Sequence, residues 1–121
     1  MEFSQAKGIY QQIADQIRDR ILAGEWQEGE RIPSVRELAV GVGVNPNTVT
    51  KSYQALLDRE IIENQRGLGY FVAGDAKQRI VTQMREEFLR DELPRIVRTM
   101  RVLGMRLRDL EPHFAQSSGS S

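Results

Sequence analysis

The segment R-I-P-S-V-R-E-L-A-V-G-V-G-V-N-P-N-T-V-T, residues 31–50, has the pattern of two short helices joined by a turn. Ser34 and Glu37 have the spacing of a capping box, in which each side chain accepts a hydrogen bond from a backbone N–H left free at a helix start. Apolar residues then recur at helical spacing on one face. These residues are Val35, Leu38, Ala39 and Val42. The first half of the segment therefore predicts a capped helix with one buried side.

A turn and a second helix complete this segment. Gly41 and Gly43 supply the positive φ that a sharp turn between helices needs. Asn45 suits an N-cap, and Pro46 suits the first helical position, where a missing N–H costs nothing. A helix-turn-helix needs a small residue in its first helix, a glycine in its turn and an inward apolar residue in its second helix. The residues in these places are Ala39, Gly43 and Val49. We therefore predict a helix-turn-helix that binds DNA.

The composition of the chain is that of an ordinary compact protein. Its 121 residues suffice for one domain with a short appendage, and 40% of them are hydrophobic and 28% charged. No apolar run approaches the roughly 20 residues of a membrane span. The N-terminus lacks the features of a signal peptide, and the chain has no cysteine. We therefore expect a cytoplasmic protein with no membrane segment.

The sequence contains few residues that could form a catalytic or metal-binding site. The only histidine is His113, so the sequence has no histidine-rich metal site, and we assign this histidine near the end of the chain no role in a Ser-His-Asp relay. We expect no enzymatic activity, no cofactor and no bound metal.

The charge is balanced overall but unevenly distributed. Residues 1–75 hold 8 Lys/Arg and 11 Asp/Glu, whereas residues 76–121 hold 9 and 6. The charge of the whole first domain therefore does not favour DNA binding. Locally, however, residues 38–57 contain Lys51 and no acidic residue. The arginines that flank the proposed surface are Arg31, Arg36 and Arg66. A small positive face on a neutral body predicts weak non-specific binding and dependence on specific contacts.

An amphipathic helix is predicted before this segment, from about Gly8 to Ala23. Isoleucine recurs every four residues from Ile9 to Ile21, and Gly24 ends the pattern. This helix would supply a third apolar face to the same core.

A hairpin is predicted after the segment. The helix that starts at Pro46 turns Val49 and Tyr53 inward. Two β-prone stretches, I-I and Y-F-V, then flank a glycine-bearing turn within residues 61–72. Three helices and a hairpin make a winged-helix domain of roughly residues 8–73.

Residues 9–72 contain five spaced motifs: I-Y-Q-Q-I, I-L-A-G-E-W, R-I-P-S-V-R-E-L-A, G-V-N-P-N-T-V and G-L-G-Y-F-V. Together these motifs resemble the DNA-binding domain of the GntR family of bacterial transcription regulators. Pro46 stands where many members have arginine, and Glu60 stands where the family commonly has glycine. The V-N-P-N-T-V form and the short C-terminal extension are similar to the YtrA-type subfamily. The resemblance implies a mainly α fold with a small β-hairpin, that is, a winged helix-turn-helix followed by a two-helix dimerisation segment.

The predicted DNA contacts lie at the start of the third helix, at the start of the second helix and at the hairpin tip. Their residues are Ser34, Arg36, Asn45, Asn47, Thr48, Thr50, Lys51, Arg66, Gly67 and Gly69. Asparagine can read adenine by two hydrogen bonds, and threonine can touch a thymine methyl. We expect Lys51 to contact a phosphate. The resemblance implies that Arg36 contacts DNA from the second helix.

Several of these residues also have a simpler interpretation. Asn45 is more simply an N-cap, and Ser34 can both cap a helix and donate to a phosphate. Arg36 could instead pair with Glu37 or Glu30 at the surface. The hairpin tip could be an ordinary turn.

Helical periodicity returns after Gly74. An apolar stripe starts at Ile80, and Pro94 then interrupts or kinks the helix. Spacings of four and three continue from Ile96 to Leu110, which is close to a heptad seam. Two helices of this size cannot build a core alone, so a homodimer is the economical solution. The predicted dimerisation residues are Met84, Phe88, Ile96, Met100, Leu103 and Leu107.

We therefore predict a DNA-binding domain in residues 1–74, a dimerisation segment in residues 75–112 and a flexible tail in residues 113–121. The expected function is sequence-specific transcription regulation by a homodimeric repressor on an inverted-repeat operator in double-stranded DNA. The resemblance implies control of a transporter operon and names no small-molecule effector. The alternative is a winged-helix module that binds protein and no specific DNA, which the neutral charge favours.

Overall fold

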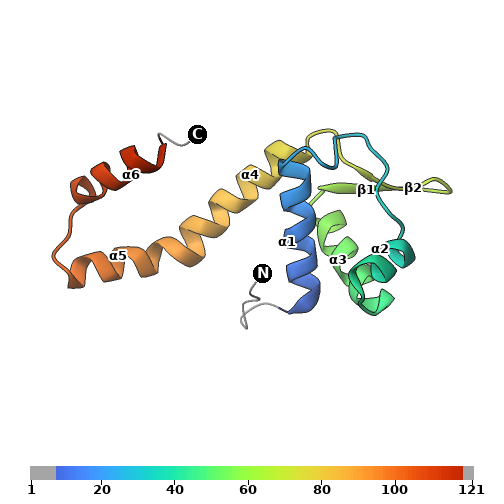
Figure 1. Cartoon of the computed structure of the whole chain (residues 1–121), viewed down its shortest axis with the longest axis horizontal. Helices are drawn as coiled ribbons and strands as arrows, with labels where there is room; N and C mark the ends of the chain where they lie inside the picture. Colours follow the sequence, from blue (N-terminus) through green and yellow to red (C-terminus); the bar gives the residue numbers. More distant parts are fainter. Residues whose placement is uncertain (1–7, 119–121) are drawn as a thin grey trace. The chain divides into compact units, whose positions relative to one another are not determined.

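The computed structural model describes residues 8–118, which divide after Gln83 into two compact units. The first unit holds α1 (Ile9–Leu22), α2 (Val35–Val42), α3 (Pro46–Asp58), β1 (Ile62–Gln65), β2 (Gly69–Val72) and the first turns of α4 (Ala76–Glu87). The three helices pack together with the hairpin beside them (Figure 1). This arrangement is a winged helix-turn-helix, and it confirms the predicted mainly α fold with a small β-hairpin.

Helix α1 contributes a row of isoleucines to the core. Ile13, Ile17 and Ile21 are buried, whereas Ile9 at the helix start is 46% exposed. The helix ends where the sequence predicts, because Gly24 follows it with a φ of +82°.

Helix α3 is held by buried hydroxyl groups as well as by apolar packing. Ser52 donates hydrogen bonds to the carbonyl of Tyr10 in α1 at 2.8 Å and to that of Thr48 at 3.0 Å. Tyr53 donates to the carbonyl of Pro33, just before α2, at 2.6 Å, and burial raises the pKa of its phenol. Its ring also meets Tyr70 of β2 edge-on, with 4.9 Å between ring centroids. One helix is thus tied to α1, α2 and the hairpin.

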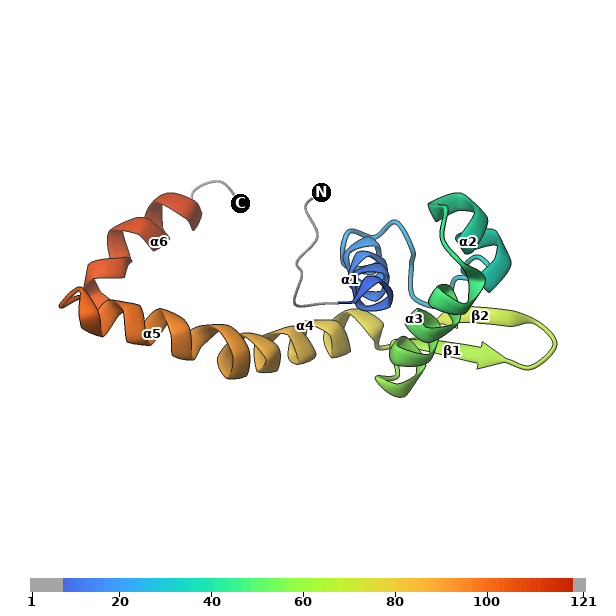
Figure 2. The ribbon, with the colours of Figure 1, turned by 90° about the horizontal axis from the view of Figure 1, so that it is seen from below.

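The hairpin is a two-stranded antiparallel sheet whose register runs from Ile62 opposite Val72 to Gln65 opposite Gly69. The loop between α1 and α2 adds to its outer edge, because the Ile32 N–H donates to the carbonyl of Tyr70 at 2.9 Å and Arg31 forms a bridge with Phe71. The tip of the hairpin extends past α2 and α3 (Figures 1 and 2). The hairpin is therefore a wing that is fixed at its base.

The turn between α2 and α3 differs in detail from the expectation. Gly41 lies inside α2, and Gly43 alone takes the positive φ, +80°, with its N–H donating to the carbonyl of Ala39 at 2.8 Å. Val42 is 41% exposed, and Val44 packs against the core in its place. The prediction that two glycines turn the chain was wrong, because one left-handed residue suffices to end α2.

The second unit continues from α4 into a π-helical segment, Phe88–Glu92, and then into α5 (Leu93–Val102). Pro94 does not interrupt the helix, because α5 begins at Leu93 directly after the π-helical segment. The Leu93 N–H donates to the carbonyl of Phe88, five residues back, in the turn before the proline. No helix in residues 8–118 is long and apolar enough to cross a membrane.

The predicted heptad seam does not lie on one helix. Helix α5 ends at Val102, and Gly104 takes a φ of +67°. The chain then forms a 3₁₀ turn, Leu107–Leu110, and α6 (Glu111–Ser118). The prediction of one seam from Ile96 to Leu110 was wrong, because the signal of Gly104 after a helix outweighs the apolar spacing. Helix α6 covers part of the segment expected as a flexible tail, and residues 119–121 lie outside the described residues.

Three helices end in the same hydrogen-bonding pattern, the Schellman motif, but one of them lacks glycine. After α3, the Ile61 N–H donates to the carbonyl of Leu56 and the Glu60 N–H to that of Leu57, both at 3.0 Å. Gly24 and Gly104 hold the left-handed position after α1 and α5, whereas Glu60 holds it after α3 with a φ of +61°. Glu60 stands where glycine would be free of strain.

We expect Glu60→Gly to leave the free energy of unfolding within about 1 kcal/mol of the wild type. Relief of left-handed strain contributes about 1–2 kcal/mol. The entropy of a new glycine and the loss of an exposed ion pair each cost up to about 1 kcal/mol. Asp58→Gly is the matched control, since it also removes an exposed carboxylate but adds a glycine at a helical position. Urea unfolding at one protomer concentration compares them. An equal loss in both variants would contradict the strain at Glu60.

Candidate nucleic-acid interface

The first turns of α3 present polar side chains on the side opposite the core. Asn47, Thr50 and Lys51 are exposed and Thr48 is half-buried, whereas Val49 is fully buried. The Thr50 hydroxyl donates to the carbonyl of Pro46 at 3.1 Å, which leaves its methyl group and oxygen lone pairs at the surface. Within residues 8–118, the side chains of Asn47, Thr48 and Lys51 make no hydrogen bond or ion pair. These three side chains are therefore available to a ligand.

Asn45 has the structural role that its sequence position favours. Its side-chain oxygen accepts a hydrogen bond from the Asn47 N–H at 2.8 Å, so it caps α3, and Pro46 takes the first helical position. The Asn45 amide NH₂ group remains exposed beside Asn47.

The start of α2 carries the predicted capping box. The Ser34 hydroxyl accepts from the Glu37 N–H at 3.1 Å, and the Glu37 carboxylate accepts from the Ser34 N–H at 3.0 Å. Arg36 is exposed on the same turn and pairs with neither Glu37 nor Glu30 in the described part of the chain. Its guanidinium is therefore free to contact a phosphate or a base, while the Ser34 hydroxyl keeps a proton to donate.

The backbone at the tip of the wing is open to close approach by a ligand. Arg66 is exposed, and Gly67 has a φ of +80° with open space where a side chain would stand. Gly69 has a φ of +118°, and a Cβ there would lie 3.0 Å from Nε of Arg31. The Arg31 side chain thus lies against the start of β2, beside the tip of the wing. Arg31 was not among the predicted contacts, because the pairing of its loop with β2 leaves no local signal in the sequence.

The predicted dimerisation residues lie in separate pieces of the second unit. Met84 and Phe88 lie on α4 and the π-helical segment, and Ile96 and Met100 lie on α5. Leu103 caps α5, and Leu107 begins the 3₁₀ turn. All are exposed except Met100, which is half-buried. The unit therefore leaves apolar side chains uncovered on several of its elements.

A fixed polar face on the third of three packed helices, with a wing that carries an exposed arginine beside it, defines a winged helix-turn-helix DNA-binding protein. Residues 9–72 match the family of bacterial regulatory proteins called the gntR family. The chain belongs to this GntR family of transcription regulators, which bind DNA and are not enzymes.

Two Bacillus subtilis proteins are similar to this chain over most of its length. The uncharacterized HTH-type transcriptional regulator YhcF is 39% identical over 86% of this chain and 84% of its own. The HTH-type transcriptional repressor YtrA is 35% identical over 91% of this chain and 84% of its own. A solved structure of a GntR-family regulator from Bacteroides thetaiotaomicron is 42% identical and superposes with a TM-score of 0.82, covering 93% of this chain and 98% of that one. These likenesses place the chain in the YtrA-like subfamily.

We expect Glu37→Gln to lower stability at neutral pH but not in acid. Hydrogen bonds from the Ser34 backbone N–H and then through its hydroxyl hold the pKa of Glu37 below its ordinary value of 4.5. A carboxylate with a lowered pKa contributes stability above its unfolded pKa, and this contribution is lost as the pH falls through the folded pKa. Glutamine keeps an acceptor oxygen but cannot ionise. Tm values should therefore differ at pH 7 and converge below pH 4.5. A pH-independent difference would contradict this account.

Proposed function

We propose that this protein is a homodimeric repressor that acts in the cytoplasm on an inverted-repeat operator. Each copy places the start of α3 in the major groove of one half-site, and the half-sites lie about 34–36 Å or a multiple apart. The observation that carries the proposal is the polar start of α3, where the side chains of Asn47, Thr48 and Lys51 have no partner within residues 8–118, on a helix whose other side is buried in the core.

The side chains of this surface support a division of roles. Asn47 and Thr48 are placed to read base edges by hydrogen bonds, and the Thr50 methyl group is placed to contact a thymine methyl. Lys51 and Arg36 bind phosphates through their positive charge, and Ser34 is a further hydrogen-bond donor to them. Asn45 caps α3. At the wing, Arg66 is suited to the minor groove, and Gly67 and Gly69 allow the backbone to approach it.

Dimerisation is supported by the uncovered apolar side chains of the second unit. Phe88 and Ile96 are each 41% exposed and Leu107 is 79% exposed. Apolar groups at this density are usually buried against a partner. We propose residues 1–74 as the DNA-binding part and residues 75–112 as the dimerising part, with residues 113–121 as the tail.

The repressor assignment and the target genes come from the subfamily. YtrA of Bacillus subtilis is described as a transcriptional repressor. Blocking of a promoter needs only stable occupancy of its operator, which a dimeric winged helix supplies. We propose that the operator lies before a transporter operon.

We expect Thr48→Ala and Lys51→Ala to weaken DNA binding in different ways. Thr48→Ala should lower affinity by about 1–3 kcal/mol at one base position and relax the preference there. Lys51→Ala should weaken all sequences alike and reduce the salt slope by about 1 for each half-site, that is, by about 2 for the dimer. Affinities are measured by anisotropy over a salt series, on the duplex that the wild-type protein selects from a random pool. Arg108→Ala, outside the winged-helix unit, is the control. Unchanged affinity in folded Thr48→Ala or Arg36→Ala would reject the contact assignment.

We expect Met100→Glu to dissociate the dimer, because a carboxylate cannot be buried without a partner. Val102→Glu is the matched control, since Val102 is 80% exposed on the same helix and two residues further on, so it points to another side. Light scattering at one concentration should show dimers for the wild type and the control and monomers for Met100→Glu. A dimeric Met100→Glu would place the interface elsewhere.

A further inference from the structure

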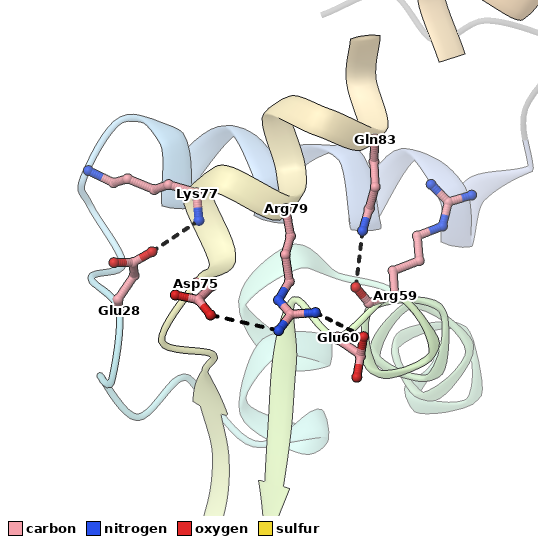
Figure 3. Close-up of polar contacts among 7 residues, drawn as sticks. All are labelled: Glu28, Arg59, Glu60, Asp75, Lys77, Arg79 and Gln83. Atoms are coloured by element: carbon pink, nitrogen blue, oxygen red, sulfur yellow. Dashed lines mark hydrogen bonds and ion pairs between the residues drawn. The ribbon is translucent and has the colours of Figure 1, made fainter. Parts of the chain in front are cut away.

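Two side chains of α4 reach the C-terminal end of α3 (Figure 3). Arg79 donates from Nη1 to Oε2 of Glu60 at 2.8 Å. One turn further on, Gln83 donates from Nε2 to the main-chain carbonyl of Arg59 at 3.0 Å. Arg59 and Glu60 are the residues that end α3, so α4 holds α3 at the end opposite to the start that we propose binds DNA.

The start of α4 is fixed at a second point. The Lys77 N–H, a free donor in the first turn, donates to the carboxylate of Glu28 in the loop after α1 at 3.1 Å (Figure 3). Asp75, just before the helix, lies 3.8 Å from Nη2 of Arg79. The side chain of Arg79 is therefore held between two carboxylates.

Apolar packing attaches α4 to the first unit but does not fix its direction. Ala76 and Ile80 are fully buried in the core of the first unit. Two residues one turn apart form a single point of contact, about which a helix can tilt. The polar links add contacts to the loop after α1 and to the end of α3, beyond that apolar point of contact.

These links are not explained by a gain in stability. Arg79 and Glu60 side chains are 39% and 74% exposed, and such ion pairs contribute little. Glu60 takes a left-handed conformation that glycine would adopt without strain. In addition, Nε of Arg79 and Oε1 of Gln83 are buried without a hydrogen-bond partner in the described residues, which costs free energy. These contacts lower the free energy of unfolding or raise it only slightly, so stability does not explain them. The direction of α4 relative to α3 is the other property that they can affect.

We propose that Arg79 and Gln83 are positioning residues for operator binding. They fix the direction in which α4 leaves the C-terminal end of α3, and thereby the half-site spacing that a dimer accepts. This inference rests on the proposed function, because spacing has meaning only for two copies on one operator. Glu60, in place of the glycine common in the family, supplies the carboxylate that makes the link possible.

The test uses the full chain and a set of duplexes. Each duplex carries the same two selected half-sites, with spacers that differ by one base pair over one helical turn of DNA. Wild-type protein should prefer one spacing, whereas Arg79→Met and Glu60→Gly should lose roughly three- to tenfold of that preference. Affinity for a duplex with a single half-site should stay within about twofold, because no DNA-facing residue changes. Gln83→Leu should act in the same direction.

Two controls separate positioning from general damage. Lys77→Met removes a positive charge from the same helix, but its side chain extends away from the links (Figure 3), so the spacing preference should be kept. Arg79→Lys can still pair with Glu60 and should restore most of the preference. Glu60→Gly is the variant that keeps the test valid if Arg79→Met folds poorly, since it relieves strain. Tm measurements monitor folding of all variants.

The outcomes distinguish the two proposals. If wild-type protein is monomeric, or binds single and paired half-sites alike, the proposed function fails. If wild-type protein is spacing-selective and Glu60→Gly keeps the same selectivity, only the positioning role fails. Faster amide exchange in residues 76–83 of Arg79→Met supports the role. Unchanged exchange there overturns it, because the buried side chains of Ala76 and Ile80 would then hold the helix without the polar links.

Discussion

The burial of one side of α3 is the constraint on which the rest of the structure depends. Val49, Tyr53 and Leu56 are held at 1% exposure or less, and a helix with about 3.6 residues per turn has no remaining rotational freedom once they are placed. Asn47 and Lys51 must then face outward at its start. The residues that stabilise the domain therefore also select the residues that are available to DNA.

Features decided within a few residues of chain could be predicted from the sequence. Ser34 and Glu37 form their capping box, and Asn45 caps α3, because the partners are only two or three residues apart. The bridge of Arg31 to Phe71 could not be predicted, since it joins segments 40 residues apart through backbone groups that every residue carries. The link from Arg79 to Glu60 was also missed, because nothing local in the sequence brings together two charged side chains that lie 19 residues apart.

The ends of helices show where periodicity misleads. Apolar spacing continues past Val102, but Gly104 has ended α5 by then, so Leu107 lies on a different element. Glycine after a helix was the correct signal, as it was at Gly24. At Glu60 the reverse holds, because the same left-handed turn forms without glycine. The hydrogen bonds of the Schellman motif fix this turn. The residue at its left-handed position changes only the conformational energy of the turn, which is higher for a residue with a side chain than for glycine.

A net charge of zero makes geometry more important here than in a strongly basic DNA-binding protein. A chain with equal numbers of Lys/Arg and Asp/Glu has only a weak sequence-independent attraction to DNA. Two linked copies gain affinity only when both can engage at once, and the gain is lost when their separation does not match the half-sites. On our proposal, residues that hold α4 against α3, such as Arg79, act on affinity without touching DNA. The left-handed conformation of Glu60 lowers the stability of the fold. On our proposal, selection for operator recognition keeps Glu60 at this position because its carboxylate binds Arg79.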